Sequence, residues 1–272
     1  MSAVKRQLVY IGLLGMSLLV LASGCAANSH TVFSPDGNVG VYFSLDSEGR
    51  PHYAVRLDDR PVVQPSALGL VRSDQSFSDG LTLVRTSAVQ RVADRYTMPH
   101  GKRQVCVYEA NRRVFTLKNP NGRMVQIVFQ VSNDGVAFRY AFDDASEQRV
   151  SVLSEQTAFA FDPDTQAWLH PMQPGKSGWE QTQPSYEEHY VVDTVGKPSP
   201  HGEGWCFPAL FKTPQGDWVL ISDTDVDRNY CAARLAHRSD GGVYRIAFPH
   251  PQEHRGSQDP VEPQVTLPFE SP

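Results

Sequence analysis

Residues 114–142 have the sequence VFTLKNPNGRMVQIVFQVSNDGVAFRYAF. Three runs of alternating apolar and polar residues are separated by two turn sequences, Asn119-Pro120-Asn121-Gly122 and Asn133-Asp134-Gly135. Asn-Gly and Asp-Gly between alternating runs are strong hairpin signals, because these residues accept a positive φ. The stretch therefore predicts three consecutive antiparallel strands, over residues 114–117, 124–131 and 136–142.

The same alternation of short strands and turns continues on both sides of this stretch. Further strands are expected at Val39–Leu45, His52–Leu57, Trp218–Ser222 and Val243–Phe248 and around Val152, Phe159 and Phe161. No segment sustains a long helical period, and the best helical candidate is the short run Ala88–Tyr96. Residues 249–272 are rich in proline and charge, which suggests a linker or an extended strap. Strands this numerous predict a large all-β sandwich.

The N-terminal 25 residues have the organisation of an export signal. Lys5 and Arg6 precede an apolar run, Leu8–Leu21, which is too short for a confident membrane span. Ala22-Ser23-Gly24-Cys25 then resembles a bacterial lipobox, in which Cys25 is lipidated and becomes the new N-terminus; plain cleavage is the alternative. We expect an exported protein of the periplasm or outer membrane that touches the membrane only through a lipid anchor, with residues 26–33 as a short tether.

Charge and cysteine content narrow the possible partners. Loss of Lys5 and Arg6 with the signal leaves 23 basic against 30 acidic residues and moves the formal charge from −5 to −7. A mildly acidic surface argues against nucleic acid as a partner. Cys106, Cys206 and Cys231 match no zinc pattern, so we expect apolar burial, with a Cys206–Cys231 bridge as the alternative.

Aromatic and acidic residues gather between Trp168 and Tyr190, in the sequence WLHPMQPGKSGWEQTQPSYEEHY. Flat aromatic faces beside carboxylates suit a sugar site or a metal-assisted sugar site. Two plainer interpretations stay open: the aromatic residues pack a core or an interface, and Glu187 is an ordinary surface carboxylate. Zinc held by His170, His189 and Glu187 is a further alternative without a recognised spacing.

Five motifs together resemble the N-terminal domain of glycoside hydrolase family 97, which comprises α-glucosidases and α-galactosidases. They span residues 34–272 in the same order as in the family. The motifs are Ser34-Pro35-Asp36-Gly37-Asn38, Asn133–Tyr140, Tyr186-Glu187-Glu188-His189-Tyr190 (the family's Tyr-Glu-x-x-Tyr), Gly216–Asp225 and Phe269-Glu270-Ser271-Pro272. One departure is that Ser222-Asp223 replaces the family's usual Thr-Glu, which puts in doubt any role for the carboxylate there.

The resemblance implies a large antiparallel β-super-sandwich, galactose-mutarotase-like, over residues 34–272. In the family this domain packs against a catalytic (β/α)8 barrel, which we expect after residue 272. Glycoside hydrolysis needs two carboxyl groups that flank the scissile bond. If both lie in the barrel, this chain carries no catalytic residue and is inactive alone, as part of a glycoside hydrolase that acts on α-linked oligosaccharides or α-glycosides.

The resemblance also implies a calcium ion, to which the glutamate of Tyr-Glu-x-x-Tyr, here Glu187, contributes from the N-terminal domain. Calcium takes six to eight oxygen ligands, and one glutamate supplies at most two, so the barrel must supply others. Trp179 and Tyr186 are the expected substrate-binding residues. If the segment is extended, Glu188 points to the opposite face from Glu187, and we expect it to face solvent.

Two other functions stay open from the sequence. The sandwich alone could be a non-catalytic carbohydrate-binding lipoprotein of the envelope, or a structural envelope lipoprotein without a ligand. The reading frame beyond Pro272 distinguishes the first of these from the hydrolase: a stop codon favours the binding module, and βα periodicity favours the enzyme.

Overall fold

A computed structural model describes residues 30–144, 146–173, 188–226, 232–248 and 264–271. In this part of the chain three antiparallel sheets and one 3₁₀ turn, Asp240–Gly242, account for the regular structure, and no α-helix occurs. The described residues include no helix long and apolar enough to cross a membrane. The all-β prediction is confirmed.

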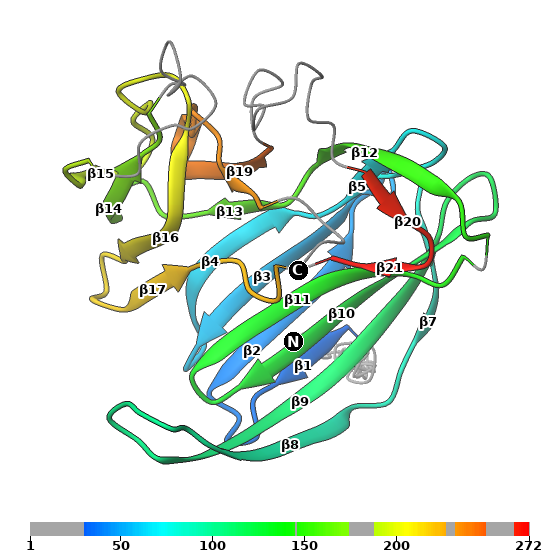
Figure 1. Cartoon of the computed structure of the whole chain (residues 1–272), viewed down its shortest axis with the longest axis horizontal. Coiled ribbons are helices and arrows are strands. Elements are labelled where there is room, and N and C mark those ends of the chain that lie inside the picture. The colour runs from blue at the N-terminus through cyan, green and yellow to red at the C-terminus, as the bar shows by residue number, and fades with distance from the viewer. Residues whose placement is uncertain (1–29, 145, 174–187, 227–231, 249–263, 272) are drawn as a thin grey trace, which may run out of the picture.

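The largest sheet has the order β1-β2-β3-β4-β13-β19-β18-β16-β14-β15, with β17 paired to β16 (Figure 1). Its strands are β1 (Thr31–Phe33), β2 (Val39–Leu45), β3 (Pro51–Leu57), β4 (Arg60–Ala67), β13 (Ala158–Ala160), β14 (Gln166–Pro171), β15 (Val191–Thr194), β16 (Trp205–Lys212), β17 (Trp218–Ile221), β18 (Arg234–Leu235) and β19 (Val243–Ala247).

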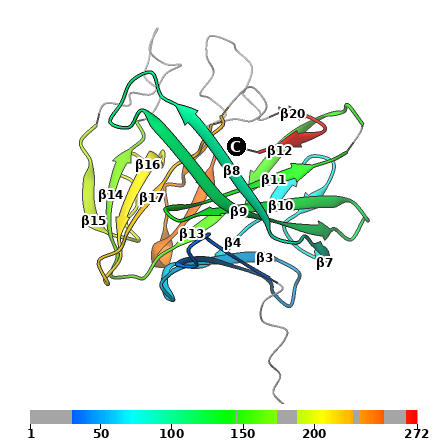
Figure 2. The same cartoon turned by 90° about the horizontal axis from the view of Figure 1, so that it is seen from below.

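The second sheet has the order β21-β11-β10-β9-β7, with β8 paired to β9, and a third small sheet has the order β20-β12-β5-β6. The strands are β7 (Thr82–Thr86), β8 (Gln90–Thr97), β9 (Val105–Lys118), β10 (Met124–Ser132), β11 (Gly135–Phe142) and β21 (Phe269–Glu270), then β5 (Leu70–Arg72), β6 (Ser76–Phe77), β12 (Arg149–Glu155) and β20 (Gln264–Thr266). Seen from below, β3 and β4 lie opposite β9, β10 and β11 (Figure 2).

The strands predicted at residues 124–131 and 136–142 are β10 and β11, and the one predicted at 114–117 is the C-terminal end of the longer β9, which begins at Val105. Ser132 pairs with Gly135, so Asn133 and Asp134 form a two-residue turn, as their sequence indicates. Arg139 on β11 forms an ion pair of 2.7 Å with Glu270. Inward-facing aromatic rings join the two layers, since the ring of Phe43 on β2 stacks on that of Phe115 on β9 at a centroid distance of 4.4 Å.

Two expectations are corrected, and one pair of alternatives is decided. The helical candidate Ala88–Tyr96 is strand β8, whose residues pair with the N-terminal half of β9, because cross-strand pairing overrides weak local propensity. The tether 26–33 includes strand β1, since Val32 is buried and β1 pairs with β2. The C-terminal stretch contributes two strands, and the Phe269 ring stacks on that of Phe142 at 4.8 Å, which supports the strap over the linker.

The cysteines are only partly described. Cys206 is buried, with its Sγ 3.9 Å from Sδ of Met172. Cys106 is a half-buried free thiol on β9, and Cys231 lies outside the described residues. Burial is confirmed for Cys206, and the alternative of a bridge to Cys231 stays a prediction.

Candidate functional site

A polar cluster lies where the chain leaves β14 and returns toward β15. The pairing of these strands places Leu169 opposite Val191, which brings residues 188–190 beside residues 170–173. Five side chains, those of His170, Gln173, Glu188, Tyr190 and His201, make the contacts described below. We refer to them as the Glu188 cluster. Residues 174–187, which include Glu187, separate its two halves in the sequence.

Each half of the Glu188 cluster is tied to the other by hydrogen bonds. The backbone N–H of Glu188 donates to Nε2 of His170 at 3.0 Å. The side-chain amide of Gln173 donates to Oε1 of Glu188, and the same amide nitrogen lies 3.0 Å from Nε2 of His201. Nε2 of His201 is 3.9 Å from Oε1 of Glu188. These contacts fix the backbone directly after Glu187.

His170 is the buried member of the cluster, with 9% of its surface exposed. Its Nε2 accepts a hydrogen bond in this arrangement and so carries no proton there, which leaves the proton of the neutral ring on Nδ1. The ring also packs edge-on against Tyr190, with centroids 5.5 Å apart. His170 therefore serves as an acceptor that holds the chain at residue 188.

Replacing His170 with alanine is expected to lower the free energy of unfolding by about 1–3 kcal/mol, because the part-buried Glu188 N–H loses its acceptor. Chemical denaturation measures the loss, and hydrogen exchange at the Glu188 amide is expected to accelerate. His189→Ala is the matched control, since His189 is exposed, and about 0.5 kcal/mol or less is expected. Equal effects of the two variants would contradict the anchoring role.

The structure locates only part of the predicted site. Glu187, Tyr186, Trp179 and Cys25 lie outside the described residues, so their roles stay predictions. Trp168 is described: it lies half-buried on β14, with its ring against that of Trp218 at 5.0 Å, which favours the packing interpretation.

The expectation for Glu188 was wrong. Its side chain does not face open solvent but is 30% exposed, and its carboxylate accepts from Gln173. The strand alternation used for that expectation does not apply, because Glu188 precedes β15 and belongs to no strand. Sequence reasoning also missed Gln173 and His201, because no local pattern shows that three separate segments meet here.

The described residues supply no complete metal site: among them no group of three or more His, Cys, Asp or Glu could hold a metal ion. The Glu188 carboxylate already accepts a hydrogen bond, and one free oxygen is far from the six to eight that calcium requires. A carboxylate is nevertheless the donor that calcium prefers. The role of Glu187 as a partial calcium ligand stays a prediction, because Glu187 lies outside the described residues. The zinc alternative gains no support, since His170 is buried whereas His189 is exposed.

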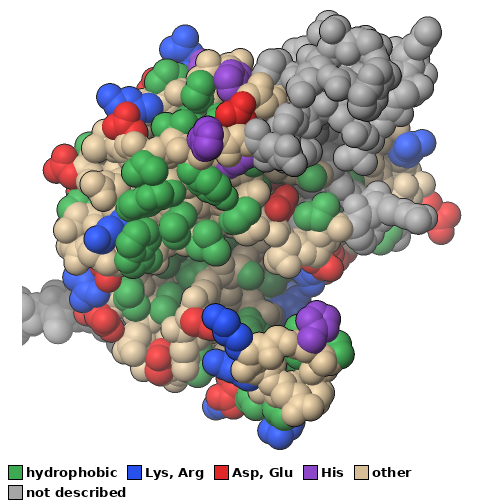
Figure 3. All heavy atoms as spheres, turned by 60° about the vertical axis from the view of Figure 1, so that its left-hand side comes forward, with side chains coloured by type: hydrophobic (Ala, Val, Ile, Leu, Met, Phe, Trp, Pro, Cys, Tyr) green, Lys and Arg blue, Asp and Glu red, His purple; other side chains and the backbone are tan. Residues whose placement is uncertain are grey.

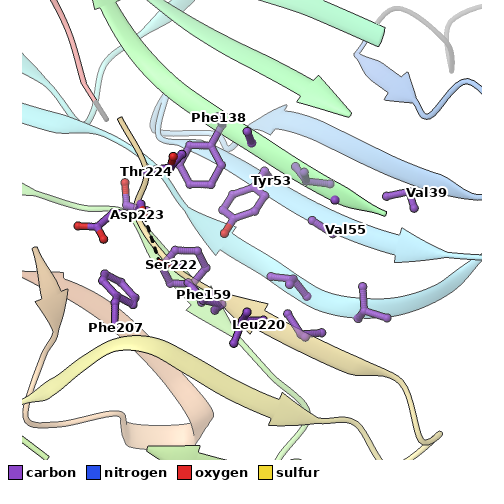
Figure 4. Close-up of a pocket in the computed structure, with 18 of the residues that line it drawn as sticks. Val39, Tyr53, Val55, Phe138, Phe159, Phe207, Leu220, Ser222, Asp223 and Thr224 are labelled. Atoms are coloured by element: carbon purple, nitrogen blue, oxygen red, sulfur yellow. Dashed lines mark hydrogen bonds between the residues drawn. The ribbon is translucent and has the colours of Figure 1, made fainter. Parts of the chain in front are cut away.

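A second feature is an apolar cavity of about 430 Å³ between β3, β4, β11 and β17 (Figure 4). Tyr53, Phe138, Phe159 and Phe207 line it, together with aliphatic side chains. The hydroxyl of Tyr53 donates to the carbonyl oxygen of Ala158 at 3.0 Å, and burial raises the pKa of this phenol, so it stays protonated. Polar residues line the cavity as well, at the turn Asn133-Asp134 and at Ser222–Thr224, and no sequence signal separates this lining from ordinary core.

Asp223, which stands where the family usually has a glutamate, also lines this cavity. Its Oδ2 accepts a hydrogen bond of 3.4 Å from the backbone N–H of Ala233, so it joins the two ends of the segment between β17 and β18. This contact is structural and gives no support to a metal-binding role.

Comparisons with known proteins point to a single family of glycoside hydrolases. A family profile described as Glycosyl-hydrolase 97 N-terminal matches residues 32–266. A probable retaining α-galactosidase from Streptomyces bingchenggensis (strain BCW-1) is 31% identical over 247 residues. The match covers 89% of this chain and 36% of the relative, so the chain spans little more than a third of that protein's length.

Two solved structures are similar to this chain. A β-arabinopyranosidase has a TM-score of 0.83 at 33% identity, covering 89% of this chain and 38% of its own. A glycoside hydrolase family 97 enzyme from Pseudoalteromonas sp. strain K8, whose E480Q variant was solved with panose, has a TM-score of 0.68 at 24% identity, covering 87% of this chain and 35% of its own. At that identity the second likeness shows the fold alone.

Proposed function

Because this chain belongs to glycoside hydrolase family 97 through the family's N-terminal domain, we propose that it is the N-terminal part of an exo-acting α-glycoside hydrolase. In this proposal it forms one wall of the active site and contributes Glu187 to a calcium ion shared with a catalytic region. The relatives it matches are roughly two and a half times its length, which leaves room for such a region.

The observation that carries the proposal is the Glu188 cluster. The family's Tyr-Glu-x-x-Tyr motif falls on residues 186–190, and its second half is held by buried His170 and by Gln173. A metal ligand needs a backbone that is fixed by its surroundings, since a loosely held carboxylate loses affinity. The hydrogen bond to His170, one residue beyond Glu187, provides such an anchor.

The roles proposed for this domain and for the catalytic region follow from the chemistry of glycoside cleavage. One carboxyl group protonates the leaving oxygen and a second acts as nucleophile or base, and both belong to the catalytic region in this proposal. Calcium, when bound, would supply a positive charge that polarises or orients groups at the scissile bond. Glu187 would hold the ion from this domain, while Trp179 and Tyr186 would contact the sugar.

The substrate proposed is an α-galactoside or a sugar of the same ring stereochemistry. Two relatives above 30% identity are a probable retaining α-galactosidase and a β-arabinopyranosidase. In the L series a β-arabinopyranoside has the ring-hydroxyl arrangement of an α-D-galactoside without its exocyclic CH₂OH group. One pocket could therefore accept both sugars, whereas a glucoside presents the opposite configuration at C4.

Hydrolysis of 4-nitrophenyl α-glycosides tests the function. The longer protein is expected to cleave the α-galactoside with a kcat/KM at least about tenfold above that for the α-glucoside, because a pocket built to hydrogen-bond one hydroxyl rejects its epimer. This chain alone is expected to cleave neither. A longer protein inactive on every α-glycoside would refute the proposed function, and a preference for the glucoside would refute only its substrate.

The cellular location is also a proposal. The lipobox-like sequence before Cys25 supports a lipid-anchored protein of the periplasm or outer membrane. Intact mass of the exported protein checks it, since an N-terminus without an acyl group would mean simple cleavage.

A further inference from the structure

The hairpin formed by β8 and β9 extends beyond the sheet that carries it (Figure 1). The pairing of β9 with β10 starts only at Ala110, which lies opposite Ser132 at the end of β10. The pairing of β9 with β8 continues outward to Val105. In the described part of the chain, β8 is therefore the only strand partner of residues 105–109. We name the outer end of this hairpin, residues 95–108, the hairpin tip.

The hairpin tip carries positive charge on an otherwise acidic protein. It contains Arg95, Lys102 and Arg103, together with His100, and no aspartate or glutamate. After residue 25 the chain has 23 basic and 30 acidic residues, so the part outside the tip has 20 basic against 30 acidic residues. The three cationic side chains are exposed. The tip therefore presents to solvent a positive surface that contains no carboxylate side chain of its own.

Exposed apolar side chains occupy the same hairpin tip. Val107 is 58% exposed, Tyr96 47%, Val105 42% and Met98 39%. Val105 and Val107 share one face of β9 because strand residues alternate, and Arg95 lies opposite Val107. Single exposed apolar residues are ordinary, but four of them on one projecting hairpin form a group. Figure 3 shows hydrophobic and basic side chains together on the lobe at the lower edge of the molecule, where Figure 1 places this hairpin.

Cations and apolar side chains in one projecting element suit the surface of an anionic membrane. Lysine and arginine are attracted to negatively charged lipid headgroups. Apolar side chains and tyrosine are stabilised at the boundary between the headgroups and the acyl chains. A soluble phosphate would satisfy only the cations, because it offers nothing to the apolar residues. The acidic remainder of the protein is repelled by such a membrane, so the tip is the part expected to approach it.

We propose that the hairpin tip is a membrane-contact site that binds bilayers containing anionic phospholipids. Arg95, Lys102 and Arg103 contact the headgroup phosphates, while Met98 and Val107 enter the apolar side of the interface. A few cations and apolar side chains give weak and reversible binding, which is enough to orient a protein on a membrane but not to anchor it. This site is independent of the proposed glycosidase function, because it uses only residues of the tip.

Co-sedimentation with lipid vesicles tests the proposal on the mature chain, without residues 1–25 and therefore without an acyl group. The chain is expected to bind vesicles of phosphatidylcholine with phosphatidylglycerol but not vesicles of phosphatidylcholine alone, and to bind less as the salt concentration rises. Lys102→Ser combined with Arg103→Ser is expected to lower the partition coefficient by about 25-fold, because each cation near an anionic surface strengthens binding about fivefold.

Lys197→Ser combined with Arg238→Ser is the matched control for this variant. It removes the same two kinds of charge from exposed positions outside the tip, and it is expected to bind as the wild type does. Thermal unfolding curves that match the wild type show that both double variants fold. Equal losses of binding in the two double variants would mean that overall charge, rather than the tip, controls binding, and would overturn the inference.

Met98→Ser combined with Val107→Ser distinguishes a membrane from a soluble anion. This variant keeps every charge of the tip and is expected to bind the anionic vesicles at least about fivefold more weakly, because it loses apolar surface. Wild-type binding by this variant, or release of the vesicles by inorganic phosphate but not by chloride of equal ionic strength, would mean recognition of a free anion and overturn the inference. Binding by this chain but not by the longer protein would also overturn it, since another region would then cover the tip.

Discussion

Replacing Glu187 with Gln in the longer protein is expected to lower kcat/KM for α-galactoside hydrolysis by about 10–100-fold. The amide keeps the size of the side chain but removes the negative charge and the bidentate oxygen donor, both of which calcium requires. Excess calcium is expected to restore part of the activity, because the loss comes from weaker binding of the ion. Initial rates measured against calcium concentration separate these two effects.

Asp193→Asn is the matched control for this substitution. Asp193 is an exposed carboxylate on β15, close in sequence to Glu187, and its hydrogen bond to the Thr194 N–H is one that an asparagine oxygen can keep. Its activity is expected to match that of the wild type. If both variants lost activity equally, the effect would reflect general surface charge rather than a calcium ligand.

Arg72→Leu is expected to lower the free energy of unfolding by about 3–5 kcal/mol, toward the lower end. The Arg72 side chain is 1% exposed, and its Nη2 lies 2.7 Å from Asp74 and 3.1 Å from Asp144. The guanidinium also lies over the rings of Phe77 and Phe142. Its loss leaves two carboxylates uncompensated, although both keep some contact with water.

The measurement for Arg72→Leu is urea denaturation followed by circular dichroism. Arg91→Leu is the control, because Arg91 pairs with Glu109 at 2.8 Å on the open surface, where such pairs contribute about 0–1 kcal/mol. A loss for Arg72→Leu no greater than that for Arg91→Leu would mean that the buried ion pair does not hold β5 against the sandwich.

Much of the fold follows from local sequence. Residues 114–142 specify β10, β11 and the C-terminal end of β9, because alternation and turn residues act over a few positions. Local reasoning failed where partners are distant in sequence. The run 88–96 has no strong preference of its own, and only its pairing with β9 makes it a strand. β1 is similar, since its three residues gain their conformation from β2.

Less of the candidate site could be predicted from the sequence. The five motifs together identified the family, and the match over residues 32–266 confirms it. Three segments of the chain meet at the site, and their meeting brings together the acceptor nitrogen of His170, the amide of Gln173 and the ring of His201. No residue spacing in the sequence shows that these segments meet.

Calcium binding measured by isothermal titration calorimetry tests the central claim most directly, that this domain shares a calcium ion with a catalytic region. The longer protein is expected to bind calcium at a single site, with the dissociation constant at least about tenfold higher in Glu187→Gln. This chain alone is expected to bind far more weakly, since it lacks most of the required oxygens. An unchanged dissociation constant in Glu187→Gln, or equally tight binding by this chain alone, would contradict the account.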